Sequence, residues 1–105
     1  MLTVALDMET RGTPPAVTLV LVGEVDMVTS PRIATALDRL LAQGCRSVEV
    51  DMSGVTFLSA AGLSVFVKWD SRYRNVAAQL VLVKPSRVAA RSLRITDLDL
   101  VLTVR

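Results

Sequence analysis

Hydrophobic and polar residues alternate at the start of the chain, and this pattern predicts a strand over residues 2–9 with one apolar face. Turn-forming residues follow at 11–15 and end in Pro14 and Pro15, which cannot donate hydrogen bonds to a sheet. Residues 17–22 are then almost all apolar, which is typical of a strand covered on both faces. The first two strands are therefore expected to form a hairpin.

Helix-start signals recur three times farther along the chain. Each predicted helix opens at a serine whose hydroxyl can accept a hydrogen bond from a free amide of the first turn. The predicted helices span residues 30–43, 59–75 and 86–95, beginning at Ser30, Ser59 and Ser86. Apolar segments predict further strands over residues 47–50, 79–83 and 100–104.

The order of these elements, β-β-α-β-α-β-α-β, indicates the α/β class. Strand–helix–strand units make parallel neighbours, whereas the hairpin places the first strand antiparallel to the second. We therefore expect residues 1–105 to form a single domain with a small mixed β-sheet, an antiparallel N-terminal strand and helices packed on the sheet. Functional loops follow the carboxyl ends of parallel strands, which points to residues 23–30 and 51–61.

The amino-acid composition excludes several kinds of catalytic and metal-binding site. The 105 residues include no histidine and one cysteine, Cys45. Histidine-based catalysis and nearly all metal sites are thereby excluded, so no catalytic residue, metal or cofactor is expected. Aromatic residues make up only 4% of the chain, too few for the stacked platform of a protein that binds RNA or single-stranded DNA. The composition favours a binding protein.

The N-terminus and the apolar segments bear on localisation. The first ten residues include acidic side chains and lack the basic segment of a secretory signal. No apolar run reaches the roughly 18 residues that a membrane span requires. We therefore expect a cytoplasmic protein without a membrane span.

The segment from Asp51 to Leu63 carries the most information about function. Its strand is expected to end at the acidic residue, after which Phe57 and Leu58 enter the core and small residues begin a helix. These small helix-start residues are Ser59, Ala60, Ala61 and Gly62. They allow another backbone to approach closely, and the free amides beside them can bind an anion. Helix capping and tight packing of the helix on the sheet also explain them, since small residues are common at helix starts.

This segment resembles the central motif of STAS domains, in particular that of the bacterial anti-sigma factor antagonists. That family reads D-L-S-x-V-x-F-h-D-S-S-G-L, where h is apolar, and the chain reads DMSGVTFLSAAGL at residues 51–63. The family's GELD segment corresponds to GEVD at residues 23–26, and a later segment with serine and proline corresponds to residues 85–88. The resemblance spans residues 2–104 and implies a STAS fold.

The resemblance also implies a switch protein without catalysis of its own. In the family, the unphosphorylated antagonist binds an ATP-dependent anti-sigma factor kinase and frees the sigma factor. Phosphorylation of the second serine of D-S-S-G-L then ejects the antagonist. That phosphoacceptor falls on Ala61, the preceding serine on Ala60 and the acidic residue on Ser59. Since alanine has no hydroxyl, the chain resembles an antagonist that lacks the usual serine phosphoswitch.

Several consequences of this substitution stay open. One alternative is that the domain binds its partner constitutively. A second is that it is modified at a neighbouring hydroxyl, that of Ser59 or Ser64. A third is that it is a scaffold subunit of a stress-signalling or lipid-transport complex. Ser59 is also explained as a simple helix cap. A nucleotide or other anionic ligand at residues 60–62 is a further class of function.

Four other residues are candidates for the partner-binding surface. Asp26 and Asp51 are expected at strand ends facing the helix start, where they either contact a partner or cap their own loops. Val65 and Trp69 share a flank of the second helix with Ala61. Tryptophan is a frequent interface anchor, although packing at the edge of the domain explains it as well.

Overall fold

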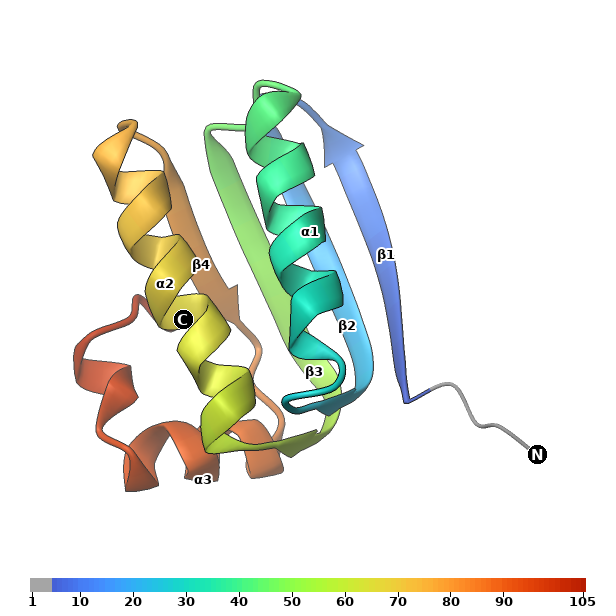
Figure 1. Ribbon diagram of the computed structural model, residues 1–105, viewed down its shortest axis with the longest axis vertical. Helices are drawn as coiled ribbons and strands as arrows, with labels where there is room; N and C mark the ends of the chain where they lie inside the picture. Colours follow the sequence, from blue (N-terminus) through green and yellow to red (C-terminus); the bar gives the residue numbers. More distant parts are fainter. Residues whose placement is uncertain (1–4) are drawn as a thin grey trace.

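The computed structural model describes residues 5–105, in which one face of a four-stranded sheet carries two long helices (Figure 1). In chain order the elements are β1 (Leu6–Thr13), β2 (Ala16–Val25), α1 (Ser30–Ala42), β3 (Ser47–Leu58), α2 (Ala60–Asn75), β4 (Gln79–Val83), α3 (Arg87–Ile95) and the 3₁₀ helix η1 (Leu98–Leu100). The strand order is β1-β2-β3-β4, with β1 antiparallel to β2 and the other neighbours parallel. The predicted fold class, a mixed sheet with an antiparallel N-terminal strand, is confirmed.

The core lies between the sheet and the helices α1 and α2. Alternate residues of β2, namely Val17, Leu19 and Leu21, are buried in it. Val22 points to the other side of the sheet and is 50% exposed. The prediction that this strand is covered on both faces is therefore wrong. Valine suits a pleated, half-buried surface, so a continuous run of apolar residues does not require two covered faces.

β3 departs most from the predicted elements. The strand was expected to end at residue 50 and to be followed by a loop over residues 51–61, but it continues to Leu58. Its second half pairs with β2 through two register shifts, and such irregularities break the period-two pattern. Phe57 is 48% exposed, so only Leu58 of the expected apolar pair enters the core.

The first two strands also extend farther along the chain than predicted. Residues 2–4 of the predicted strand lie outside the described residues, and β1 runs on to Thr13. It does so because Pro14 and Pro15 alone form the turn, with Thr13 paired to the residue that follows them. β2 likewise continues past residue 23, where the pattern placed the start of a loop.

The strand predicted over residues 100–104 is wrong. The 3₁₀ helix η1 ends at the first residue of this segment, Leu100. Within residues 5–105, the segment joins the sheet through an isolated parallel bridge between Leu82 and Val104 and forms no named strand. Leu100 and Val101 are exposed, so these apolar residues do not pack as a strand would. Asp97 adopts a left-handed conformation with φ of 57° where α3 ends, and this reversal precedes η1.

The remaining elements agree with the sequence pattern. β4 has the predicted bounds, and α2 and α3 begin immediately after Ser59 and Ser86, whose side chains cap them. The Oγ of Ser86 accepts a hydrogen bond from the amide of Ala89 at 3.1 Å. α1 differs, because its N-cap residue is Thr29 and the predicted cap, Ser30, lies inside the helix.

Candidate functional site

The carboxyl ends of β2 and β3 lie side by side, since Val25 pairs with Leu58. The amide of Ser59 donates a hydrogen bond to the carbonyl oxygen of Val25 at 3.0 Å, which fixes the start of α2 to the end of β2. The loop after β2 and the first turn of α2 therefore meet at one end of the sheet (Figure 1). The parts of the predicted loops that follow these strands, residues 26–30 and 59–61, come together there, as parallel pairing predicts.

Gly62 allows the helix to approach this closely. A β-carbon at this position would lie 2.6 Å from the carbonyl oxygen of Val25 and 2.8 Å from its carbonyl carbon. Both distances are shorter than van der Waals contact, and both atoms belong to the backbone. The first turn of α2 can therefore rest on the end of β2 only with glycine at this position.

Ser59 is the N-cap of α2. Its backbone is extended, with φ of −86° and ψ of 165°, and its Oγ accepts a hydrogen bond from the amide of Gly62 at 3.0 Å. The capping explanation for this serine is confirmed. The other neighbouring hydroxyl, that of Ser64, is exposed and donates to the carbonyl oxygen of Ala61 at 2.7 Å.

Replacing Ser59 by alanine is expected to lower the free energy of unfolding by about 1 kcal/mol, because the amide of Gly62 loses its acceptor. Ser59→Asp is expected to retain the wild-type stability, since a carboxylate also caps and interacts favourably with the helix dipole. Urea denaturation followed by circular dichroism measures both variants. An equal loss of stability in the two would contradict the capping role.

Asp26 organises the loop after β2. Its Oδ1 accepts hydrogen bonds from the amides of Val28 and Thr29, both at 2.9 Å. The hydroxyl of Thr29 accepts from the amide of Asp26 and donates to the carbonyl oxygen of Glu24. The bonds that the Asp26 carboxylate accepts from the Thr29 amide, the Val28 amide and the Thr29 hydroxyl, in that order of importance, hold the pKa of Asp26 below its usual value despite some desolvation. Of the two explanations for Asp26, the structure shows loop capping. The amides that its carboxylate binds precede the first turn of α1, and the side chain of the N-cap residue, Thr29, caps no amide of that turn.

The lowered pKa of Asp26 makes the loop sensitive to acid. The ordinary pKa is 3.8, so the ionised carboxylate stabilises the folded state above that value, and this stabilisation is lost as the pH falls through the lower, folded pKa. The free energy of unfolding is therefore expected to fall less between about pH 6 and about pH 3 in Asp26→Asn than in wild type. Urea denaturation at both pH values measures this difference. The same loss in both proteins would show that Asp26 does not contribute.

Asp51 does not lie where the sequence pattern placed it. It is inside β3, where it pairs with Val20 of β2 and Val83 of β4. Its carboxylate accepts hydrogen bonds from the amide and hydroxyl of Ser53, at 2.9 and 2.7 Å, and the amide bond contributes most to holding the pKa of Asp51 below its usual value. The prediction that Asp51 ends its strand and faces the helix start is wrong, because β3 continues past it.

Val65 and Trp69 are both buried. The ring of Trp69 packs edge-to-face against Tyr73 with the ring centroids 6.5 Å apart. The guanidinium carbon of Arg72 lies 5.0 Å from the centroid of the Trp69 ring. Trp69 thus packs within the domain, and neither Val65 nor Trp69 belongs to the exposed surface around Ala61.

An exposed and largely apolar surface surrounds the start of α2. Ala60, Ala61 and Ser64 are exposed on the helix, and Met27 and Val28 are 73% and 79% exposed in the adjoining loop. We call these five residues the helix-start surface. Met27 and Val28 were not among the predicted site residues, although two successive apolar residues in a loop were a signal for them. Exposed apolar groups that gather in this way are typical of an interaction site.

Two further features bear on chemistry. Within residues 5–105, no group of three or more His, Cys, Asp or Glu side chains is placed to hold a metal ion. No helix in the same part of the chain is long and apolar enough to cross a membrane.

Comparison with known proteins agrees with this architecture. The family model of the STAS domain matches residues 7–105. The anti-sigma-B factor antagonist of Listeria monocytogenes is 28% identical over 83 residues, which cover 79% of this chain and 73% of the Listeria protein. The crystal structure of an anti-sigma factor antagonist from Mycobacterium paratuberculosis superimposes with a TM-score of 0.77 at 20% identity, over 94% of this chain and 84% of that one. The Bacillus cell fate determinant SpoIIAA in its phosphorylated form has a TM-score of 0.70 at 18% identity, over 96% and 91%. With a family model matched along nearly its whole length and the fold of these structures, the protein belongs to the STAS domain family.

Proposed function

We propose that this protein is an anti-sigma factor antagonist that binds an anti-sigma factor through its helix-start surface and so regulates the availability of a sigma factor. The observation that carries the proposal is the exposed apolar surface around Ala61. The resemblance of residues 51–63 assigns this residue to the position of the family's phosphoacceptor. Burial of this surface against a partner is favourable, at roughly 25 cal/mol per Å² of apolar area. The names of the Listeria and Mycobacterium proteins, both antagonists, support this role.

In this proposal Ala61 makes the interaction constitutive. SpoIIAA has been solved in an unphosphorylated and a phosphorylated form. A phosphate adds a charge of about −1.5 to −2, which an apolar interface cannot solvate. Residue 61 of this chain offers a methyl group and no oxygen for a kinase to modify. Binding is then set by the amounts of the two proteins rather than by modification of this residue.

The resemblance of residues 51–63 extends the proposal to the kind of partner. We assign the partner to the anti-sigma factors of the ATP-dependent serine kinase type, and we place the interaction in the cytoplasm. The protein itself acts by binding and is not an enzyme. In support, the helix-start surface consists of methyl, thioether and hydroxyl groups, and the nearby Asp26 carboxylate already accepts hydrogen bonds from its own loop. No general base or activated nucleophile is thus supplied there.

Isothermal titration calorimetry of the purified protein against each anti-sigma factor kinase of its source organism tests the proposal. Tight binding to one of them is expected, and incubation with that kinase and ATP should leave residue 61 unmodified. The same titration against a lipid-transport ATPase tests the scaffold alternative. Binding to the ATPase together with no binding to any anti-sigma factor would overturn the antagonist role in favour of the scaffold.

A further inference from the structure

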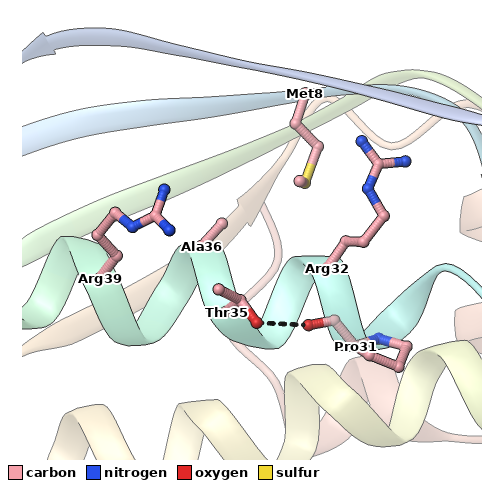
Figure 2. Close-up of a pocket in the computed structure, with 6 residues that line it drawn as sticks. All are labelled: Met8, Pro31, Arg32, Thr35, Ala36 and Arg39. Atoms are coloured by element: carbon pink, nitrogen blue, oxygen red, sulfur yellow. Dashed lines mark hydrogen bonds between the residues drawn. The ribbon is translucent and has the colours of Figure 1, made fainter.

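A groove of about 360 Å³ lies between β1 and α1, on the side of α1 away from α2 (Figure 1). Its apolar lining, called the floor below, comes from Met8 of β1 and from Pro31 and Ala36 of α1. Figure 2 shows the side chains of Arg32 and Arg39 extending from the helix toward β1 on either side of Met8. The groove therefore joins an apolar floor to two guanidinium groups.

β1 is the edge strand of the sheet, and among residues 5–105 no further strand pairs with its outer side, which lies beside this groove. The amide of Glu24 donates to the carbonyl oxygen of Ala5, and the register then pairs Leu6 with Gly23. Because bonded and non-bonded pairs alternate in an antiparallel ladder, the odd-numbered residues of β1 bond to β2 and the even-numbered ones face outward. In agreement, the carbonyl oxygen of Leu6 is free to accept a hydrogen bond from Nη1 of Arg32 at 2.6 Å. The other outward-facing residues are Met8, Thr10 and Gly12.

The same alternation sets the direction of the side chains. Leu6 is buried beneath the helices and Met8 lines the groove, so the even-numbered residues of β1 face the helix side of the sheet. A strand added at this edge would continue the pleat. Its alternate side chains would enter the groove between β1 and α1.

The positive charge of the groove indicates which kind of partner could bind there. Arg32 and Arg39 are about two helical turns apart, roughly 10 Å along the axis. Within the part of the chain that the structure describes, neither guanidinium forms an ion pair, and none of the residues lining the groove is acidic. A second copy of this chain would bring the same arginines to the symmetric edge, where they would repel. Charge complementarity therefore favours an acidic partner.

We propose that the edge of β1 binds an extended acidic peptide segment of a partner protein as an added strand. Its backbone pairs with Met8, Thr10 and Gly12, and an apolar side chain enters the groove. Acidic residues two positions before and after that side chain meet Arg32 and Arg39. Residues four apart in a strand are separated by about 13 Å, a span that two flexible guanidinium side chains can match.

A fluorescein-labelled peptide, Thr-Glu-Thr-Leu-Thr-Glu-Thr, tests this proposal by fluorescence anisotropy with the complete protein. One control peptide carries lysine in place of both glutamates, and in a second the amide nitrogens of the leucine and of the threonine on either side of it are methylated, which removes the donors beside the groove for an added strand of either direction. Both controls are expected to bind at least about tenfold more weakly. In ¹⁵N-resolved NMR spectra the glutamate peptide should shift the amide signals of Met8, Thr10 and Gly12. Equal binding of the lysine peptide, or shifts confined to other elements, would overturn the proposal.

Variants of the protein test whether peptide binding requires the arginines of the groove. Arg39→Glu is expected to weaken binding of the glutamate peptide at least about tenfold, and Arg39→Gln by less. Arg91→Glu makes the same change of charge on α3 and should bind like wild type. Equal losses in Arg39→Glu and Arg91→Glu would reduce the interaction to general charge attraction and overturn the proposal. Ala61→Glu lies outside the groove and should retain peptide binding, so this result is independent of the proposed antagonist function.

Discussion

The variant Ala61→Glu is expected to bind the partner anti-sigma factor about 100-fold more weakly than wild type, which corresponds to about 2.7 kcal/mol. Ala61 is exposed on the first turn of α2, within the helix-start surface. A glutamate there loses its hydration when the interface closes, and an unpaired buried carboxylate costs several kcal/mol. The domain should stay folded, because an acidic residue near a helix N-terminus is stabilising by about 0.3–1 kcal/mol.

Calorimetric titration measures the affinity of Ala61→Glu and of two control variants. The controls show whether a loss of affinity comes from the charge at position 61 or from a change of charge elsewhere on the helix. Ser71→Glu makes the same change of charge at an exposed position farther along α2 and is expected to bind like wild type. Ala61→Ser keeps a small neutral side chain, so it should also bind normally. If the partner is an anti-sigma factor kinase, as proposed, the new hydroxyl is expected to be phosphorylated. If folded Ala61→Glu binds as tightly as wild type, the helix-start surface is not the interface.

The parts of the fold that could be predicted are those with local signals. The capping serines Ser59 and Ser86 and the bounds of β4 depend on residues within a few positions of each other, and the structure has them as predicted. The length of β3 instead depends on its pairing with β2 through register shifts. Residues 100–104 have the composition of a strand, but within residues 5–105 they join β4 through an isolated bridge rather than a ladder. Neither fact is contained in a local pattern.

The residues of the candidate site also fall into a group that the sequence could predict and a group that it could not. Residues 59–62 could be placed at the end of β2 because parallel pairing of β2 and β3 brings their carboxyl ends together. The burial of Trp69 also depends on α1, which packs alongside α2, and a helical-wheel pattern of one helix cannot show how widely it is covered. Met27 and Val28 lie in a loop, where no periodicity marks a residue as exposed or buried.

Gly62→Ala is expected to lower the free energy of unfolding by about 2 kcal/mol. The added methyl group would lie 2.6 Å from the carbonyl oxygen of Val25, and overpacking against backbone costs up to about 3 kcal/mol. The helix propensity gained on replacing glycine, about 1 kcal/mol, offsets only part of this cost. Urea denaturation measures the change, with Ser64→Ala as the control on the exposed side of the same turn. That control should stay within about 0.5 kcal/mol of wild type.

Gly62→Ala is also expected to affect binding in the molecules that remain folded. Relief of the contact with Val25 requires the first turn of α2 to move away from the end of β2, and this separates Ala60 and Ala61 from the loop that carries Met27 and Val28. The helix-start surface would then no longer present one continuous apolar area. Affinity for the anti-sigma factor should therefore fall, whereas peptide binding at the edge of β1 should not. Wild-type stability and wild-type affinity in this variant would show that the close approach of α2 to β2 is not required.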